Sequence, residues 1–186
     1  MWLANLEMNF PSQGRSTKHG KLRRRKKLRR IVHATLANHE FDFFEARVRS
    51  LADVVDAFIV QESNFTTFGS PKSLEFLTQF RRGWLWKHQV NATVKIHSNK
   101  KAVKINPVIP QDKIAYVFLG HFTEKGRTNG WYADSYLRTH LSRQGLRLVS
   151  GLRDDDIFLY LDADELPTRE MLLFLKVYDG YSEPIR

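Results

Sequence analysis

Apolar residues along the chain occur either in short continuous runs or at helical spacing. The run Ile31–Leu36 predicts a strand, and Phe44, Val48 and Leu51 then recur on one face of a helix. A second apolar run covers residues 56–63. Strand, helix and strand within about thirty residues form a βαβ unit, which predicts a parallel sheet with right-handed crossovers.

The same alternation continues in the second half of the chain. Apolar runs predict a third strand over 113–120 and a fourth over 156–165, and helical spacing predicts helices over 130–146 and 168–180. The fourth run begins with uniformly apolar residues, as expected for a strand that is covered on both faces. With 186 residues, the chain is long enough for one domain. We therefore expect an α/β fold with a mostly parallel sheet and flanking helices.

Positive charge is concentrated in two segments. The net charge is +10, and residues 1–30 hold ten Lys and Arg against a single acid. We expect a disordered basic tail over 1–28 and, because 81–106 are basic and unpatterned, a surface insertion there. The remaining folded part is acidic, so the high net charge alone is weak support for a nucleic-acid partner.

Three kinds of structure have no support in the sequence. Cysteine is absent, which excludes disulfides and thiolate metal sites. No apolar run approaches the ~20 residues of a membrane span. The first residues lack the basic leader and apolar stretch of a secretory signal.

The stretch "IFLYLDADELP" (157–167) places three acids directly after the fourth apolar run: Asp162, Asp164 and Glu165. In an α/β sheet, ligands bind beyond the carboxyl ends of the strands. Extended residues alternate sides, so we expect Asp162 and Asp164 to point the same way. Two close carboxylates repel unless a cation lies between them, and Mg²⁺ and Mn²⁺ prefer oxygen ligands. The motif predicts a metal that neutralises a phosphorylated leaving group.

Several alternatives remain open at this point. Acids ahead of a proline and a helix also serve as helix N-caps. A second acidic run, 154–156, precedes the strand and is expected to be a solvated turn. Haloacid-dehalogenase-type phosphatases place Asp-x-Asp after a strand, but Leu166 stands where they normally have Thr or Val. A non-catalytic protein with a basic tail could instead bind nucleic acid or acidic membranes, with Trp84 and Trp86 stacking on bases.

Five stretches in order resemble the bisecting N-acetylglucosaminyltransferase family: "RRIVHATLANHEFDFFEARVRSLADVVDAFIVQESNFTTFGSPKSLEF", "KIAYVFLGHF", "GRTNGWYADSYLRTHL", "DDDIFLYLDADELP" and "LFLKVYDGYSEP". The resemblance covers about 29–80 and 112–185, and residues 81–106 do not share it. It implies a GT-A-like, Rossmann-like fold and an inverting transferase with UDP-GlcNAc as donor. The acceptor would be the core mannose of an N-glycan on a glycoprotein, joined in β1,4 linkage. It also implies the luminal side of the Golgi membrane, reached through an anchor that this sequence lacks.

The resemblance also implies roles for individual residues. Asp162 and Asp164 would bind Mn²⁺ (or Mg²⁺) that bridges the UDP diphosphate. Glu165 would complete the acidic string, either supporting the metal acids or contacting the sugar, and is a candidate catalytic residue. No nucleic-acid partner is expected.

Two further groups of residues would bind the donor by the same resemblance. One group ends the second strand near the uridine: Glu62, Ser63 and Asn64. The other lies on the helix over 130–146, where Asp134 and Arg138 could approach the diphosphate or simply form an i,i+4 pair. Trp131 on that helix is expected in the core. The family continues well beyond residue 186, and no residue here suits a general base. We therefore expect the donor half without the acceptor half, and no sugar transfer by the isolated chain.

Overall fold

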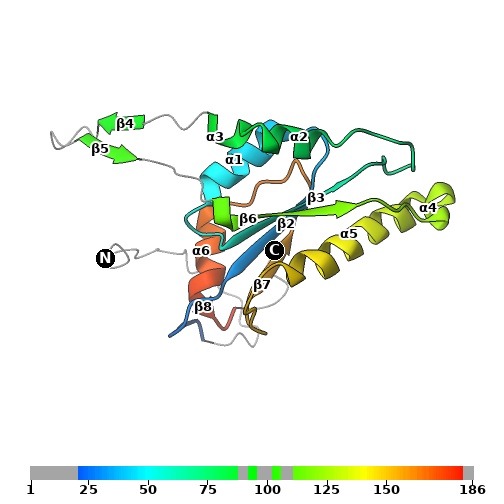
Figure 1. Cartoon of the computed structure of the whole chain (residues 1–186). Coiled ribbons are helices and arrows are strands. Elements are labelled where there is room, and N and C mark those ends of the chain that lie inside the picture. The colour runs from blue at the N-terminus through cyan, green and yellow to red at the C-terminus, as the bar shows by residue number, and fades with distance from the viewer. Residues whose placement is uncertain (1–20, 88–91, 96–101, 106–110, 182–186) are drawn as a thin grey trace.

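A four-stranded parallel sheet forms the centre of the molecule in the computed structural model, which describes residues 21–87, 92–95, 102–105 and 111–181 (Figure 1). In sheet order its strands are β6 (Ile114–Leu119), β3 (Ala57–Ser63), β2 (Ile31–Leu36) and β7 (Ile157–Tyr160). All three neighbouring pairs are parallel. The predicted α/β class with a mostly parallel sheet is confirmed.

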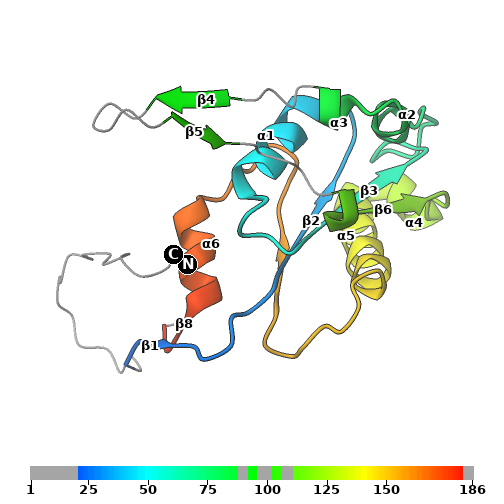
Figure 2. The same ribbon diagram turned by 60° about the vertical axis from the view of Figure 1, so that its left-hand side comes forward.

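Helices cover both faces of this sheet (Figures 1 and 2). Buried residues of four helices pack on one face: α1 (Phe41–Leu51), α2 (Glu75–Arg81), α3 (Trp84–Lys87) and α6 (Arg169–Val177). Helix α5 (Gly130–Arg147) packs on the other face. The short helix α4 (Glu124–Thr128) precedes α5, and a 3-10 turn, η1 (Gln111–Lys113), precedes β6.

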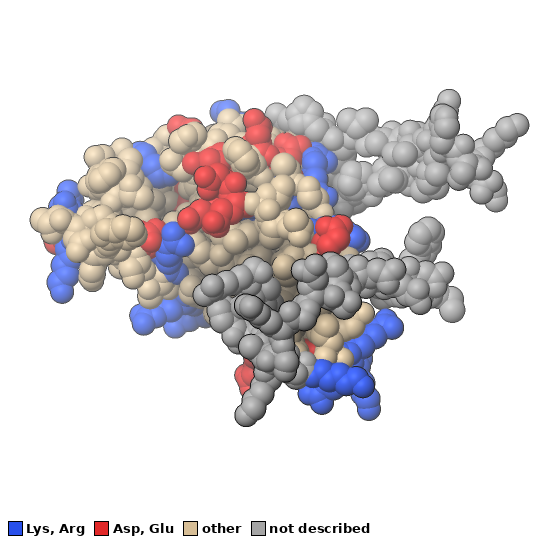
Figure 3. Space-filling model, turned by 180° about the vertical axis from the view of Figure 1, so that it is seen from behind, with Lys and Arg blue, Asp and Glu red and all other residues tan. Residues whose placement is uncertain are grey.

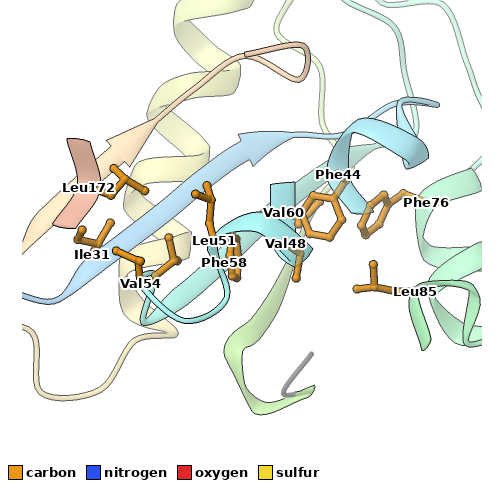
Figure 4. Packing of buried hydrophobic residues seen from close by; sticks show 11 residues of the cluster. Ile31, Phe44, Val48, Leu51, Val54, Phe58, Val60, Phe76, Leu85 and Leu172 are labelled. Atoms are coloured by element: carbon orange, nitrogen blue, oxygen red, sulfur yellow. The ribbon is translucent and has the colours of Figure 1, made fainter. Parts of the chain in front are cut away.

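Strand β2 shows why the sheet forms. Alternate residues of a strand point to opposite faces, so Ile31 joins the core under α1 while Val32 and Ala34 join the core under α5. All three are at most 1% exposed. Figure 4 shows the first of these cores, where Ile31 lies among side chains from β3, α1 and α6. A strand buried on both faces needs apolar residues throughout, which explains the continuous apolar run.

The segment 21–28 is ordered, so the predicted disordered tail is wrong for these residues. Strand β1 (Arg23–Arg24) pairs antiparallel with β8 (Tyr178–Asp179). Arg25 then forms ion pairs with Asp155 and Asp179, the second at 2.5 Å. The basic residues are held because acids from distant parts of the chain face them. Residues 1–20 lie outside the described residues.

The acidic run 154–156 is not simply a solvated turn, and that prediction is wrong for Asp155 and Asp156. The side chain of Asp156 is 3% exposed and pairs with Arg30 and Arg153. Burial alone would raise the pKa of Asp156, but hydrogen bonds from Arg153 and Arg30 outweigh it and lower that pKa. This cluster joins the amino-terminal ends of β2 and β7.

The expected insertion at 81–106 begins later than predicted. Arg81 is still part of α2, and Leu85 of α3 is fully buried in the core beneath α1. The ring of Trp84 packs edge-on against Phe41 and Phe76. Strands β4 (Ala92–Lys95) and β5 (Ala102–Ile105) form an antiparallel hairpin that projects from the body (Figure 1). Residues 88–91, 96–101 and 106 of this segment lie outside the described ranges.

Strand β7 is shorter and less buried than expected. It ends at Tyr160, and its four residues are all partly exposed. It lies at the edge of the sheet, so one side of its ladder has no neighbour among the described strands. The acids that follow do not cap α6 either, because Thr168 is the N-cap residue and accepts a hydrogen bond from the Met171 amide. The N-cap interpretation of the acidic motif is therefore wrong.

Acidic side chains gather in the middle of the molecular face shown in Figure 3, and Lys and Arg lie mostly around them. Among the described helices, none combines the length and apolar character needed to cross a membrane.

Candidate functional site

A cavity of about 260 Å³ opens at the carboxyl ends of β2 and β3. Its lining includes Leu36, at the end of β2, and Ser63, at the end of β3. Leu137 of α5 and Ala163, after β7, also line it. Small-molecule pockets range from about 300 to 1,000 Å³, so this cavity suits one part of a larger ligand. Its position is the one at which α/β sheets bind ligands.

The acids 162–165 form a tight turn beside this cavity. The Glu165 amide donates to the Asp162 carbonyl at 3.1 Å, and the Asp162 amide donates to Glu165 Oε2 at 2.9 Å. The chain has therefore left the strand before the acids begin, and the alternation that was expected to align Asp162 with Asp164 does not apply. Glu165 supports the turn through its carboxylate, and Asp164 is exposed.

Asp162 faces a cation from α5. Arg138 donates to Asp162 Oδ1 at 3.0 Å and to Asp134 Oδ2 at 2.6 Å. Its guanidinium carbon lies 4.3 Å from the centre of the Tyr160 ring, and the Tyr160 hydroxyl also donates to Asp162. The hydrogen bond with Asp134 is the largest cause that raises the pKa of Arg138. The structure thus brings Asp134, Arg138 and Asp162 together.

Arg47 lies beneath the same turn and was missed from the sequence. Its Nη2 donates to the backbone carbonyl oxygens of Asp162, Ala163 and Glu165 at 2.7, 2.8 and 2.5 Å. The residue is 1% exposed. A signal was present: Arg47 follows Phe44 by three positions and precedes Leu51 by four, so it occupies the apolar face of α1.

The residues expected near uridine have different surroundings in the structure. Glu62 is fully buried and accepts hydrogen bonds from the amides of Phe76 and Leu77 and from the Tyr116 hydroxyl. Its contacts anchor the start of α2, and it does not line the cavity. Ser63 does line it, while its hydroxyl donates to the Phe65 carbonyl at 2.7 Å.

The structure also differs from two other expectations, one after β3 and one on α5. Asn64 is exposed and lies outside the cavity lining. Trp131 is 88% exposed, so its expected core position is wrong. It belongs to the first turn of α5, which extends past the sheet.

The donor atoms at the turn suit a hard divalent cation in kind, since they are carboxylate oxygens. However, these side chains alone supply too few free ligands for a metal ion. No cluster of three or more His, Asp or Glu side chains suited to a metal occurs in the described part of the chain, and Asp162 is already paired with Arg138. Asp162 and Asp164 would therefore need other oxygen ligands, such as those of a diphosphate.

Comparison with known proteins places the chain in a family. The family model described as glycosyltransferase family 17 matches residues 6–107, which is more than half of the chain. The chain belongs to glycosyltransferase family 17. The predicted family resemblance is confirmed. The matched range includes residues 81–106, and the expectation that they form an insertion stays a prediction.

Curated relatives carry one name. The chain is 42% identical over 156 residues to proteins from human, rat and mouse called beta-1,4-mannosyl-glycoprotein 4-beta-N-acetylglucosaminyltransferase. The alignment covers 84% of this chain and 25% of each relative. This family 17 chain thus spans about a quarter of the length of these relatives. No solved structure matches it.

Proposed function

We propose that this family 17 chain is the donor-binding part of a metal-dependent, inverting glycosyltransferase. The enzyme would transfer GlcNAc from UDP-GlcNAc in β1,4 linkage to the core mannose of N-glycans on glycoproteins, on the luminal side of the Golgi membrane. The observation that carries the proposal is the acidic turn 162–165 beside a cavity at the carboxyl ends of β2 and β3. The names of the relatives support the sugar and the linkage.

Each part of the site has a task in this proposal. The cavity between Leu36, Ser63 and Leu137 receives the nucleoside, because it is partly apolar and lies at the strand ends. Asp162 and Asp164 hold the metal at its rim. A bound Mn²⁺ or Mg²⁺ supplies positive charge that stabilises UDP as it leaves. Arg138 offers a second cation at the same place, and its side chain is 38% exposed.

Glu165 is a support residue in this proposal. Its carboxylate accepts the Asp162 amide and so shapes the turn. An inverting transferase also needs a base that takes the proton of the acceptor hydroxyl. We assign that base to the part of the relatives' length that this chain does not span. We therefore expect no GlcNAc transfer by this chain alone. The measurement is incorporation of labelled GlcNAc into a purified N-glycan, and appreciable transfer would refute the expectation.

Calorimetry of UDP-GlcNAc binding tests the proposal. The wild type and Asp164→Ala are titrated with Mn²⁺ and with a chelator, and Asp154→Ala serves as a matched control from the opposite end of the sheet. We expect binding by the wild type and the control only with Mn²⁺, and at least a tenfold loss for Asp164→Ala. Equal heats in all conditions would rule out the metal role.

The non-catalytic alternative, a basic protein that docks on nucleic acid or acidic membranes, has less support. Arg25, Arg29 and Arg30 of the basic segment already pair with Asp155, Asp156 or Asp179. Salt dependence distinguishes the two functions. Nucleic-acid binding should fall steeply with added salt, whereas UDP-GlcNAc binding should depend on Mn²⁺.

A further inference from the structure

Arg47 occupies a position where a charged side chain is costly. It lies on the buried face of α1 with Phe44, Val48 and Leu51 and is 1% exposed. Removing an ion from water without compensation strongly destabilises a fold. None of the ion pairs among the described residues includes Arg47. Its charge is therefore compensated by something other than a directly bonded carboxylate.

Backbone carbonyl groups provide the compensation. One terminal nitrogen, Nη2, donates to the carbonyl oxygens of Asp162, Ala163 and Glu165 within 2.8 Å. The Asp162 carbonyl also accepts the Glu165 amide within the turn. A buried carbonyl without any partner is costly, so the bonds from Arg47 favour this conformation of the turn. A planar guanidinium on a well-packed helix can meet several carbonyl groups at once. The side chain thus ties α1 to the turn across 115 positions of sequence.

The electrostatic surroundings agree with this contact. Burial lowers the pKa of Arg47, and the nearby charges of Glu165 and Asp164 act in the opposite direction. The guanidinium contacts the backbone carbonyl oxygens of the turn, while the side chain of Asp164 is exposed. A fixed positive charge near the backbone of the turn offsets part of the repulsion among its acids.

Arg47 also adjoins the wall of the cavity. Ala163 lines the cavity of about 260 Å³ at the carboxyl ends of β2 and β3. The same alanine borders a gap of about 10 Å³ that Arg47, Phe44 and Thr35 also line. The backbone that Arg47 holds is therefore the backbone that forms one side of the candidate donor site. A shift of this turn would change both the cavity and the placement of Asp162 and Asp164.

We propose that Arg47 is a positioning residue that fixes the acidic turn 162–165 in the conformation that binds the metal and the sugar nucleotide. Its relevance to ligand binding rests on the proposed function. Its hold on the turn does not, because that is a property of the chain without ligand. The two parts are therefore measured separately.

Hydrogen exchange of the chain without ligand tests the hold on the turn. The variants are Arg47→Met, which keeps the length of the side chain but removes its charge and donors, and Arg47→Lys, which keeps the charge but not the planar fork. Arg49→Met is the matched control, since Arg49 lies on the same helix and pairs with Glu45. We expect the amides of Asp162 and Glu165 to exchange at least tenfold faster in Arg47→Met, and about threefold faster in Arg47→Lys. The control should keep the wild-type exchange at the turn.

Exchange in α5 shows whether each variant is folded. If Arg47→Met does not fold, the exchange rates of Arg47→Lys decide whether Arg47 holds the turn. Wild-type exchange at the turn in every folded Arg47 variant would overturn the proposal.

Binding of Mn²⁺ and UDP-GlcNAc tests the consequence. Free Mn²⁺ is measured by electron paramagnetic resonance in the presence of UDP-GlcNAc, at a temperature where all variants are folded. We expect at least tenfold weaker binding for Arg47→Met, partial rescue in Arg47→Lys and no change for Arg49→Met. Wild-type affinity in Arg47→Met would contradict the role in the site. Absence of binding by the wild type would instead refute the proposed function, and the exchange measurement would still decide whether Arg47 holds the turn.

Discussion

His33 should make the fold sensitive to mild acid. It lies in the middle of β2, is fully buried and faces the ring of Phe58. Neither ring nitrogen has a hydrogen-bond partner among the residues that the structure describes. Burial, together with the nearby charge of Arg47, lowers the pKa of His33 from 6.5 to about 3. The folded state therefore keeps this imidazole neutral at a pH where the unfolded chain protonates it.

The sign of the effect follows from proton linkage. Between pH 6.5 and pH 3 the unfolded state binds more protons at this position, so stability falls as the pH falls. Each pH unit well below 6.5 costs about 1.4 kcal/mol, which gives a loss of about 2 kcal/mol between pH 8 and pH 5. Carboxylates with a lowered pKa, such as Asp156, change the stability mainly at pH values below 5.

Urea unfolding at pH 5, 6, 7 and 8 measures this loss. His33→Leu removes the titrating group and its unpaired nitrogens, so we expect similar or higher stability at pH 7 and most of the pH slope to vanish. His140→Gln is the control, because His140 is only partly buried and its pKa is lowered by burial as well. It should keep most of the slope. A slope in His33→Leu equal to that of the wild type would refute the reasoning.

Two other predictions concern stability. Asp156→Ala should lower the free energy of unfolding by about 3 kcal/mol, because it leaves Arg30 and Arg153 without their buried partner. Urea unfolding measures this loss, and a loss no larger than that of Asp154→Ala would contradict the prediction. Glu62→Gln should cost about 2 kcal/mol through weaker hydrogen bonds to the start of α2. Because Glu62 lies outside the cavity, its variant should bind UDP-GlcNAc normally at temperatures where it is folded, and a selective loss of binding would place it in the site after all.

Local patterns in the sequence predicted most of the central fold. Continuous apolar runs identified β2 and β3 because both strands are buried on both faces, and the run before Tyr160 identified β7. The same rule overestimated the burial of β7, since sequence does not reveal which strand lies at an edge. The basic segment was misjudged for a related reason. Arg25 is held by Asp155 and Asp179, which lie at least 130 positions away, and no local pattern reports such pairs.

The candidate site was predicted in part. The acids after β7 lie at the carboxyl end of the sheet beside a cavity, as expected. The i,i+4 pair of Asp134 and Arg138 was also anticipated, but the contact of Arg138 with Asp162 was not. The alternation argument failed because the chain turns immediately after the strand. Arg47 was missed because a charged residue on an apolar helix face has no obvious partner in the sequence. Trp131 was misplaced because its helix extends beyond the sheet that would have covered it.

Paramagnetic broadening by Mn²⁺ tests the central claim most directly. Amide signals of the labelled chain are recorded with UDP-GlcNAc and either Mn²⁺ or diamagnetic Mg²⁺, so that loss of signal reports distance from the metal. We predict that the amides of 162–165 broaden first, followed by those around Leu36 and Ser63 at the cavity. Broadening centred on 154–156 at the opposite end of the sheet, or none at the turn while the nucleotide binds, would contradict the account.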